Sequence, residues 1–163
     1  MKNTIFKTKL KSAIIICFLP GMFFQSGCNE KAELYKSTDE LVEKTKTSIV
    51  EISVEEFVKS YQEAGKEYVL IDVRQAGEFD EDNIPGSVNI PRGVIEFKVA
   101  KEQFWQDQFM YAPADTSDII IYCKKGSRGA LATKTLMELG YKNVKNLEGG
   151  YLAYESKQQK AEE

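Results

Sequence analysis

Histidine is absent from the 163-residue chain. Without an imidazole side chain, the protein cannot use the Cys-His or Ser-His-Asp arrangements of many hydrolases. Most catalytic zinc sites are excluded for the same reason, since histidine is their usual ligand. Any chemistry therefore proceeds without imidazole as an acid, a base or a metal ligand.

A basic surplus is also lacking. The formal net charge is −3 and the isoelectric point is near 5.3. Nucleic-acid binding needs a basic face, so nucleic acid is excluded as a partner. The length suits a single domain, and the hydrophobic fraction of 42% is ordinary for a globular protein.

The N-terminal segment resembles an export signal. Four lysines precede an apolar stretch over residues 13–24: Lys2, Lys7, Lys9 and Lys11. A basic region followed by a short apolar region is typical of secretory signals. A transmembrane helix needs about 20 apolar residues, and here Pro20-Gly21 interrupts a shorter run. Residues 1–27 are therefore predicted to be a signal peptide.

Cys28 stands at the end of this segment, after Gln25-Ser26-Gly27. Small residues before a cysteine resemble the lipobox of bacterial lipoproteins, in which the cysteine becomes lipidated and N-terminal. We therefore expect an exported lipoprotein of the periplasm or cell envelope, attached to a membrane through Cys28. Cys17 would leave with the signal, and Cys123 would be the one free thiol of the mature protein. An ordinary cleaved signal and an uncleaved anchor are the alternatives.

Residues 28–48 are rich in Lys, Glu, Thr and Ser and poor in large apolar side chains. This composition predicts a solvated tether, with a helix as the alternative. The folded domain is expected over residues 49–158.

Within that domain, apolar β-branched runs alternate with helical spacing. Strands are expected at residues 49–52, 68–73, 118–122 and 143–147. Helices are expected after the Ser53/Glu56 capping box, over residues 93–109 and 128–139, and at the C-terminus. Such alternation predicts an α/β fold with a central, mostly parallel five-stranded sheet and helices on both faces. Ligands of such sheets bind beyond the carboxyl ends of the strands.

Cys123 lies at such an end, at the start of the segment Cys123-Lys124-Lys125-Gly126-Ser127-Arg128-Gly129. The glycines allow a tight turn whose amides, together with the positive end of the following helix, can bind an anionic group. A sulfur atom at the rim of this turn is favoured as the thiolate. The alternative is a buried structural cysteine.

This segment resembles the active-site loop of the rhodanese family, Cys-x4-Arg after a strand. Three further landmarks resemble the family and occur in its order: Asp72-Val73-Arg74 with Glu78-Phe79, the stretch over residues 83–91, and Leu147-Glu148-Gly149-Gly150-Tyr151. The family commonly has a histidine where this chain has Asn83, to which we assign no function. The resemblance covers the whole predicted domain and implies the rhodanese-like fold.

The resemblance also implies transfer of sulfane sulfur from thiosulfate, or a similar small anionic donor, to a thiol or cyanide acceptor or to a protein acceptor. Cys123 would carry the sulfur as a persulfide, and no cofactor or metal is implied. Lys124 and Lys125 would attract the donor, or else be merely solvated. Arg128 would organise the loop that also contains Gly126 and Ser127, either by pairing with a carboxylate or by capping the site. Asp72 and Arg74 would be structural residues beside the site, Arg74 alternatively reaching the substrate.

Three other functions are alternatives for a protein with a cysteine at this position. A persulfide carrier or sensing module without turnover would keep the same cysteine. A cysteine phosphatase or arsenate reductase of this fold uses Cys-x5-Arg, whereas four residues separate Cys123 from Arg128. A disulfide oxidoreductase would need a second cysteine near Cys123, and the predicted domain has none.

Overall fold

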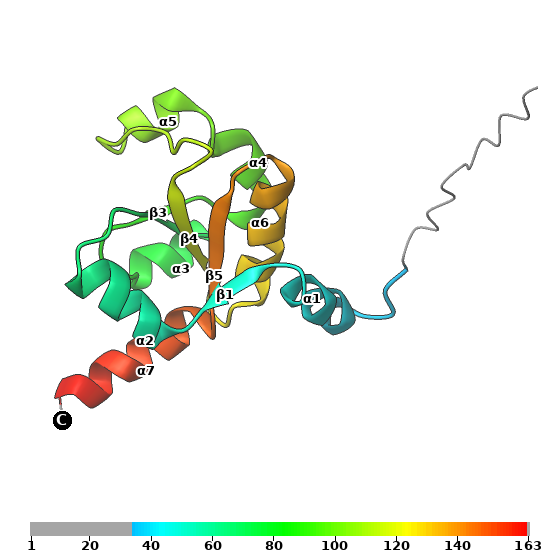
Figure 1. Ribbon diagram of the computed structural model, residues 1–163, viewed down its shortest axis with the longest axis horizontal. Coiled ribbons are helices and arrows are strands. Elements are labelled where there is room, and N and C mark those ends of the chain that lie inside the picture. The colour runs from blue at the N-terminus through cyan, green and yellow to red at the C-terminus, as the bar shows by residue number, and fades with distance from the viewer. Residues whose placement is uncertain (1–33, 163) are drawn as a thin grey trace, which may run out of the picture. The chain divides into compact units, whose positions relative to one another are not determined.

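The domain is built on one parallel β-sheet (Figure 1). The computed structural model describes residues 34–162. The strands of the sheet are Val50–Ile52 (β1), Val69–Asp72 (β2), Ser87–Asn89 (β3), Asp118–Tyr122 (β4) and Asn143–Leu147 (β5). Their spatial order is β1-β5-β4-β2-β3, and every neighbouring pair is parallel. The predicted α/β fold is confirmed, with a sheet that is entirely parallel.

Helices cover both faces of this sheet. The α-helices are Thr38–Lys46 (α1), Val54–Phe57 (α2), Ala76–Glu81 (α3), Ile95–Lys98 (α4), Glu102–Gln106 (α5), Ser127–Glu138 (α6) and Gly150–Glu162 (α7). A π-helix, Val58–Glu63 (η1), continues α2, and a 3₁₀-helix, Arg92–Val94 (η2), precedes α4.

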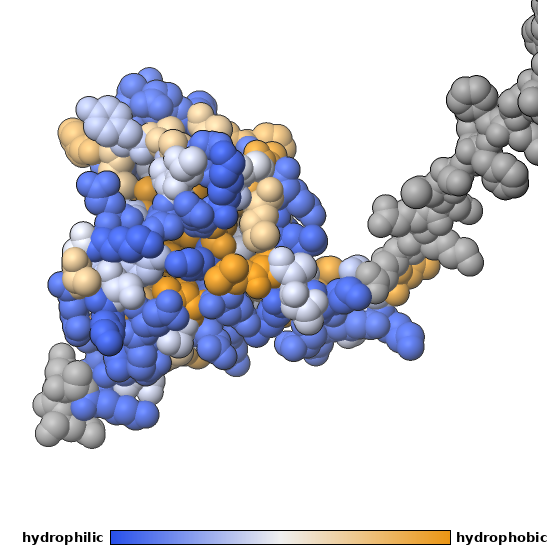
Figure 2. Space-filling model, in the orientation of Figure 1, coloured by the Kyte–Doolittle hydropathy of each residue, from blue (hydrophilic) through white to orange (hydrophobic). Residues whose placement is uncertain are grey.

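Two hydrophobic cores form because successive strand residues point to opposite faces. On one face Ile121 belongs to the core that contains Trp105 of α5 and Leu136 of α6. On the other face Ile120 belongs to the core that contains Phe57 and residues of α7. Fully burying such a side chain contributes roughly 1.5–3 kcal/mol. The edge strand β1 is less covered, and Figure 2 shows hydrophobic side chains at the centre of one face, over β1 and β5, surrounded by hydrophilic ones.

The Ser53 cap predicted from the sequence begins α2, where the Ser53 hydroxyl accepts a hydrogen bond from the Glu56 amide at 3.2 Å. The long helix predicted over residues 93–109 is wrong. The chain there forms η2, α4 and α5 as separate short pieces. Trp105 is fully buried, and its indole N–H donates to the carbonyl of Val99 at 2.8 Å. This bond uses a carbonyl that a continuous helix would have paired with a backbone amide.

The tether predicted over residues 28–48 is corrected where the structure describes it. Residues Thr38–Lys46 form α1, which is capped by the Ser37 hydroxyl and packs against α6 with Val42 buried (Figure 1). The signal peptide, Cys17 and Cys28 lie outside the described residues. In residues 34–162, no helix is long and apolar enough to cross a membrane.

Candidate active site at Cys123

Cys123 directly follows β4 at the carboxyl edge of the sheet. The same edge carries Val73 and Arg74 after β2, and Gly149 and Gly150 after β5. The cysteine is free and only 2% exposed. Among the described residues, no cluster of His, Cys, Asp or Glu side chains could hold a metal ion. Cys123 thus places one covered sulfur atom at this edge.

The loop after Cys123 turns directly into α6. Gly126 is the N-cap of this helix and has φ +92°, a left-handed conformation that favours glycine. Its carbonyl accepts the first helical hydrogen bond, from the Ala130 amide at 2.8 Å. The positive end of α6 thus begins at Ser127, four residues after the sulfur. Lys124 and Lys125 are exposed, so their charges are available to an approaching anion.

The Gly-Gly turn after β5 closes the loop from the other side. The Tyr151 amide donates to the Cys123 carbonyl at 2.8 Å, and the Leu152 amide donates to the Lys124 carbonyl at 3.1 Å. Gly150 has φ +62°, and a Cβ placed there would overlap the Cys123 carbonyl and lie 2.9 Å from the Gly126 amide. The resemblance pointed to this turn, and the structure supplies its physical reason, which is close backbone contact with the loop.

Arg128 forms a two-pronged ion pair with Glu78 of α3. Its Nη1 lies 2.7 Å from Oε2 and its Nη2 lies 2.8 Å from Oε1. The hydrogen bonds from Arg128 lower the pKa of Glu78 to about 2. The pKa of Arg128 is raised, chiefly by its hydrogen bonds to Glu78. The carboxylate partner predicted for Arg128 therefore exists.

Asp72 and Arg74 form a buried pair beneath the site. Arg74 Nε lies 2.8 Å from Asp72 Oδ2, and its Nη2 lies 2.7 Å from the same oxygen. Nη2 also donates to the Asp82 carbonyl at 2.6 Å, and the guanidinium lies over the Tyr151 ring, 4.5 Å from its centre. Burial alone would lower the pKa of Arg74, but the bonds to Asp72 raise it overall. This pair connects β2, the residues after α3 and the start of α7.

Sequence reasoning missed the roles of Tyr122 and Tyr151. The Tyr122 hydroxyl accepts a hydrogen bond from the Ile84 amide at 3.1 Å and lies 2.8 Å from Ser87 Oγ, so it fixes the turn before β3. The Tyr151 hydroxyl donates to the Asp82 carboxylate. In the sequence, Tyr122 is simply the last residue of an apolar run. The only signal for Tyr151 was its place after the Gly-Gly turn.

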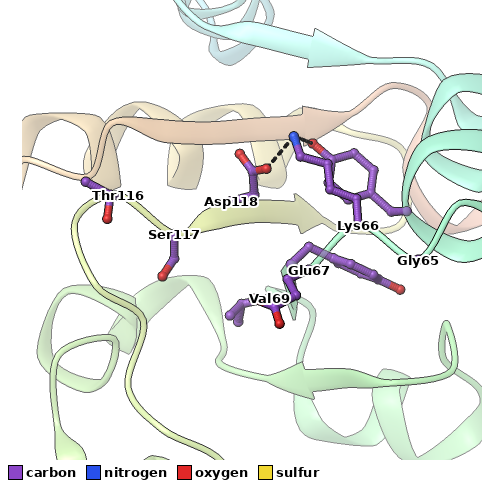
Figure 3. A pocket seen from close by; sticks show the side chains of 9 residues that line it. Gly65, Lys66, Glu67, Val69, Thr116, Ser117 and Asp118 are labelled. Carbon is purple, nitrogen blue, oxygen red and sulfur yellow. Dashed lines mark hydrogen bonds and ion pairs between the residues drawn. The ribbon is translucent and has the colours of Figure 1, made fainter.

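A cleft of about 670 Å³ lies at the opposite edge of the sheet, where β2 and β4 begin (Figure 3). Lys66 and Asp118 line it and pair with each other at 2.5 Å. These residues precede β2 and open β4, whereas Cys123 follows β4. The cleft is therefore separate from the candidate active site, and its lysine is already neutralised.

Comparison with known proteins agrees with this geometry. Residues 53–157 match the rhodanese-like domain family. Thiosulfate sulfurtransferase 18 of Arabidopsis thaliana is 34% identical over 114 residues, which is 65% of this chain and 78% of the relative. The structure of the human single-domain sulfurtransferase TSTD1 is 29% identical with a TM-score of 0.60, covering 66% of this chain and 96% of that one. A Rhodopseudomonas palustris protein described as a possible tyrosine phosphatase is 26% identical with a TM-score of 0.64, covering 77% and 94%.

Proposed function

Because the chain belongs to the rhodanese-like domain family, we propose that it is a sulfurtransferase in which Cys123 carries the transferred sulfur. The observation that carries this proposal is the position of Cys123. It is a free, covered cysteine at the carboxyl end of β4, four residues before the N-terminus of α6. The sulfurtransferase relatives support the same activity.

The reaction has two covalent steps. The Cys123 thiolate attacks the outer sulfur of thiosulfate or a similar donor. A new S–S bond forms at Cys123 while the bond to the sulfite sulfur breaks, and sulfite leaves with the electron pair. A thiolate or cyanide then attacks the outer sulfur of the Cys123 persulfide, which returns Cys123 to the thiolate. Dividing the transfer in this way replaces one difficult step with two exchanges of the thiol-disulfide type.

The residues around Cys123 each contribute to these steps. The exposed Lys124 and Lys125 raise the local concentration of an anionic donor and stabilise the departing sulfite. The amide end of α6 carries partial positive charge and begins four residues after the sulfur. Arg128 in turn is held in place by Glu78.

A phosphatase activity is the first alternative, because one structural neighbour is described as a possible tyrosine phosphatase. The loop of this chain is one residue shorter than Cys-x5-Arg, and Cys123 is almost fully covered. Both features favour a cargo of one sulfur atom over a tetrahedral phosphoryl group. Hydrolysis of a phosphotyrosine analogue by the purified protein, lost in Cys123→Ser, would favour the phosphatase instead.

The direct test is intact mass spectrometry of the full chain after exposure to thiosulfate. We expect a gain of one sulfur atom, its loss when cyanide is added, and no gain in Cys123→Ser. A wild-type protein that takes up no sulfur would overturn the proposal. Steady-state thiocyanate formation, compared with the rate of single-turnover loading, separates a turnover enzyme from a sulfur carrier or sensing module that serves a protein acceptor.

We also propose that residues 1–27 direct export and that Cys28 is lipidated, which would place the domain on a membrane in the cell envelope. This proposal rests on the composition of the segment, with lysines before residues 13–24 and small residues before Cys28.

A further inference from the structure

Asn146 lies on β5 directly under the first turn of α6. It is fully buried, and its neighbours in the sheet are Glu51 on β1 and Ile121 on β4. Its side chain contacts the loop glycines. A Cβ placed on Gly129 would lie less than 3.0 Å from Asn146 Oδ1, and a Cβ on Gly126 would lie 3.7 Å from Asn146 Nδ2. The amide group therefore fills the space between the sheet and the Cys123 loop.

The orientation of this amide is set by Glu51. Asn146 Nδ2 donates to Glu51 Oε1 at 2.7 Å. A carboxylate only accepts hydrogen bonds, so the nitrogen must face Glu51 and the oxygen must face Gly129. Glu51 is itself paired with Lys46 of α1, 3.7 Å away. A series of side-chain contacts therefore connects α1 to β1, β1 to β5, and β5 to the Cys123 loop.

Asn146 Oδ1 is buried and has no hydrogen-bond partner among the described residues. A buried acceptor without a partner carries a free-energy cost that a hydrocarbon side chain would avoid. Stability alone therefore does not account for an amide at this position. What the amide does is to limit how closely the first turn of α6 approaches the sheet, at a point where a Gly129 Cβ would also lie 3.6 Å from the Cys123 amide nitrogen.

We propose that Asn146, held by Glu51, is a positioning residue for sulfur transfer. It sets the distance between the first turn of α6 and the sheet, and this distance determines the position of the Cys123 loop relative to the persulfide. The inference rests on the proposed function, since it assigns the residue to that same site. Asn146 acts through the loop and does not touch the substrate.

A size exchange between Asn146 and Gly129 tests the proposal. Gly129→Ala should displace the loop and slow persulfide formation about a hundredfold, and Asn146→Ala should slow it about tenfold, because small misplacements of reacting groups are costly. Since Asn146→Ala removes the atom that the new methyl group meets, the double variant should recover to the rate of Asn146→Ala. Such recovery is a direct sign that the two positions are coupled.

Two readouts separate positioning from general damage to the fold. At saturating thiosulfate the rate should fall in Asn146→Ala while the half-saturating concentration stays the same, because Lys124 and Lys125 still attract the donor. Glu51→Leu, which frees the amide to turn, should slow the same step, and its effect should not add to that of Asn146→Ala. Asn143→Ala on the same strand and Gly93→Ala, where a Cβ has open space, are the matched controls and should keep the wild-type rate.

The rate of alkylation of Cys123 by iodoacetamide, measured on the Cys123 peptide by mass spectrometry, gives an answer independent of sulfur transfer. We expect the same order of rates among the variants. If the variants are alkylated in this order but the wild-type protein takes up no sulfur, the proposed function is overturned, while the role of Asn146 in positioning the loop is supported. A double variant no faster than Gly129→Ala, in both assays, would overturn the positioning role.

Discussion

Arg128 and Glu78 are joined by two parallel hydrogen bonds of 2.7 and 2.8 Å although they lie 50 residues apart in the chain. The pair links the first turn of α6, which follows the Cys123 loop, to α3. Among the described residues it is the one ion pair that connects the Cys123 loop to the segment after β2. Loss of the pair should therefore change the position of the loop that carries Cys123.

Glu78→Gln is expected to destabilise the protein by about 1 kcal/mol at neutral pH, since the pair is partly exposed and solvent screens it. The folded-state pKa of Glu78, about 2, lies below its ordinary value of 4.5. The carboxylate therefore stabilises the fold fully above about pH 4.5, and this contribution disappears as the pH falls through 2. Urea unfolding of both proteins between pH 7 and pH 2 measures the difference. A gap that stays constant over this range would contradict the assignment.

Replacing both Lys124 and Lys125 by Ala should raise the KM for thiosulfate about threefold to tenfold, with the larger effect at low salt, where the charges are least screened. The control is Lys98→Ala/Lys101→Ala, which removes the same charge from α4 and the residue before α5. Steady-state kinetics at two ionic strengths provide the measurement. An equal rise of KM in the control pair would mean that net charge, and not the loop, attracts the donor.

Gly150→Ala should unfold or strongly destabilise the protein, by more than about 2 kcal/mol, because it combines a left-handed backbone with a clash against the Cys123 carbonyl. Gly86→Ala is the matched control. It has a similar positive φ of +82° but open space around its Cβ, and it should cost about 1 kcal/mol. Thermal unfolding of the two variants isolates the clash, and equal losses would show that the contact with the loop is unimportant.

Cys28→Ala should release the protein from the membrane fraction of cells that export it, if Cys28 carries a lipid. Cell fractionation with labelling by a fatty-acid analogue tests this. Cys17→Ala is the matched control and should leave both the labelling and the fractionation unchanged. A Cys28→Ala protein that remains in the membrane would indicate an uncleaved anchor in place of a lipid.

The sequence predicted the parts of the fold that depend on local patterns. The apolar β-branched runs that form β2 and β4 are buried on both faces. The loop after Cys123 contains Gly126, which is the N-cap of α6, so this helix begins four residues after the cysteine. The break between α4 and α5 was missed because it depends on where the indole of Trp105 packs. The apolar spacing of Ile95, Val99 and Phe104 suits a continuous helix equally well.

The candidate site shows the same division. Cys123 and the loop residues are contiguous, so they could be identified as a motif. Asn146 and Tyr122 act through contacts with residues that lie far away in the chain, Glu51 and Ile84 among them. Such partners are brought together only by the order of the strands. For α1, the polar composition hid two inward-facing side chains, Val42 and Thr45, on a helix that packs against α6.

The packing of α1 against α6 limits how far the domain can lie from a lipid attached to Cys28. If a lipid holds Cys28 at a bilayer, only about nine residues separate it from Ser37, the cap of α1. A chain of that length spans at most about 30 Å when fully extended. The domain would then work close to the lipid headgroups, and the molecules that deliver or receive its sulfur would have to meet it within that shallow layer.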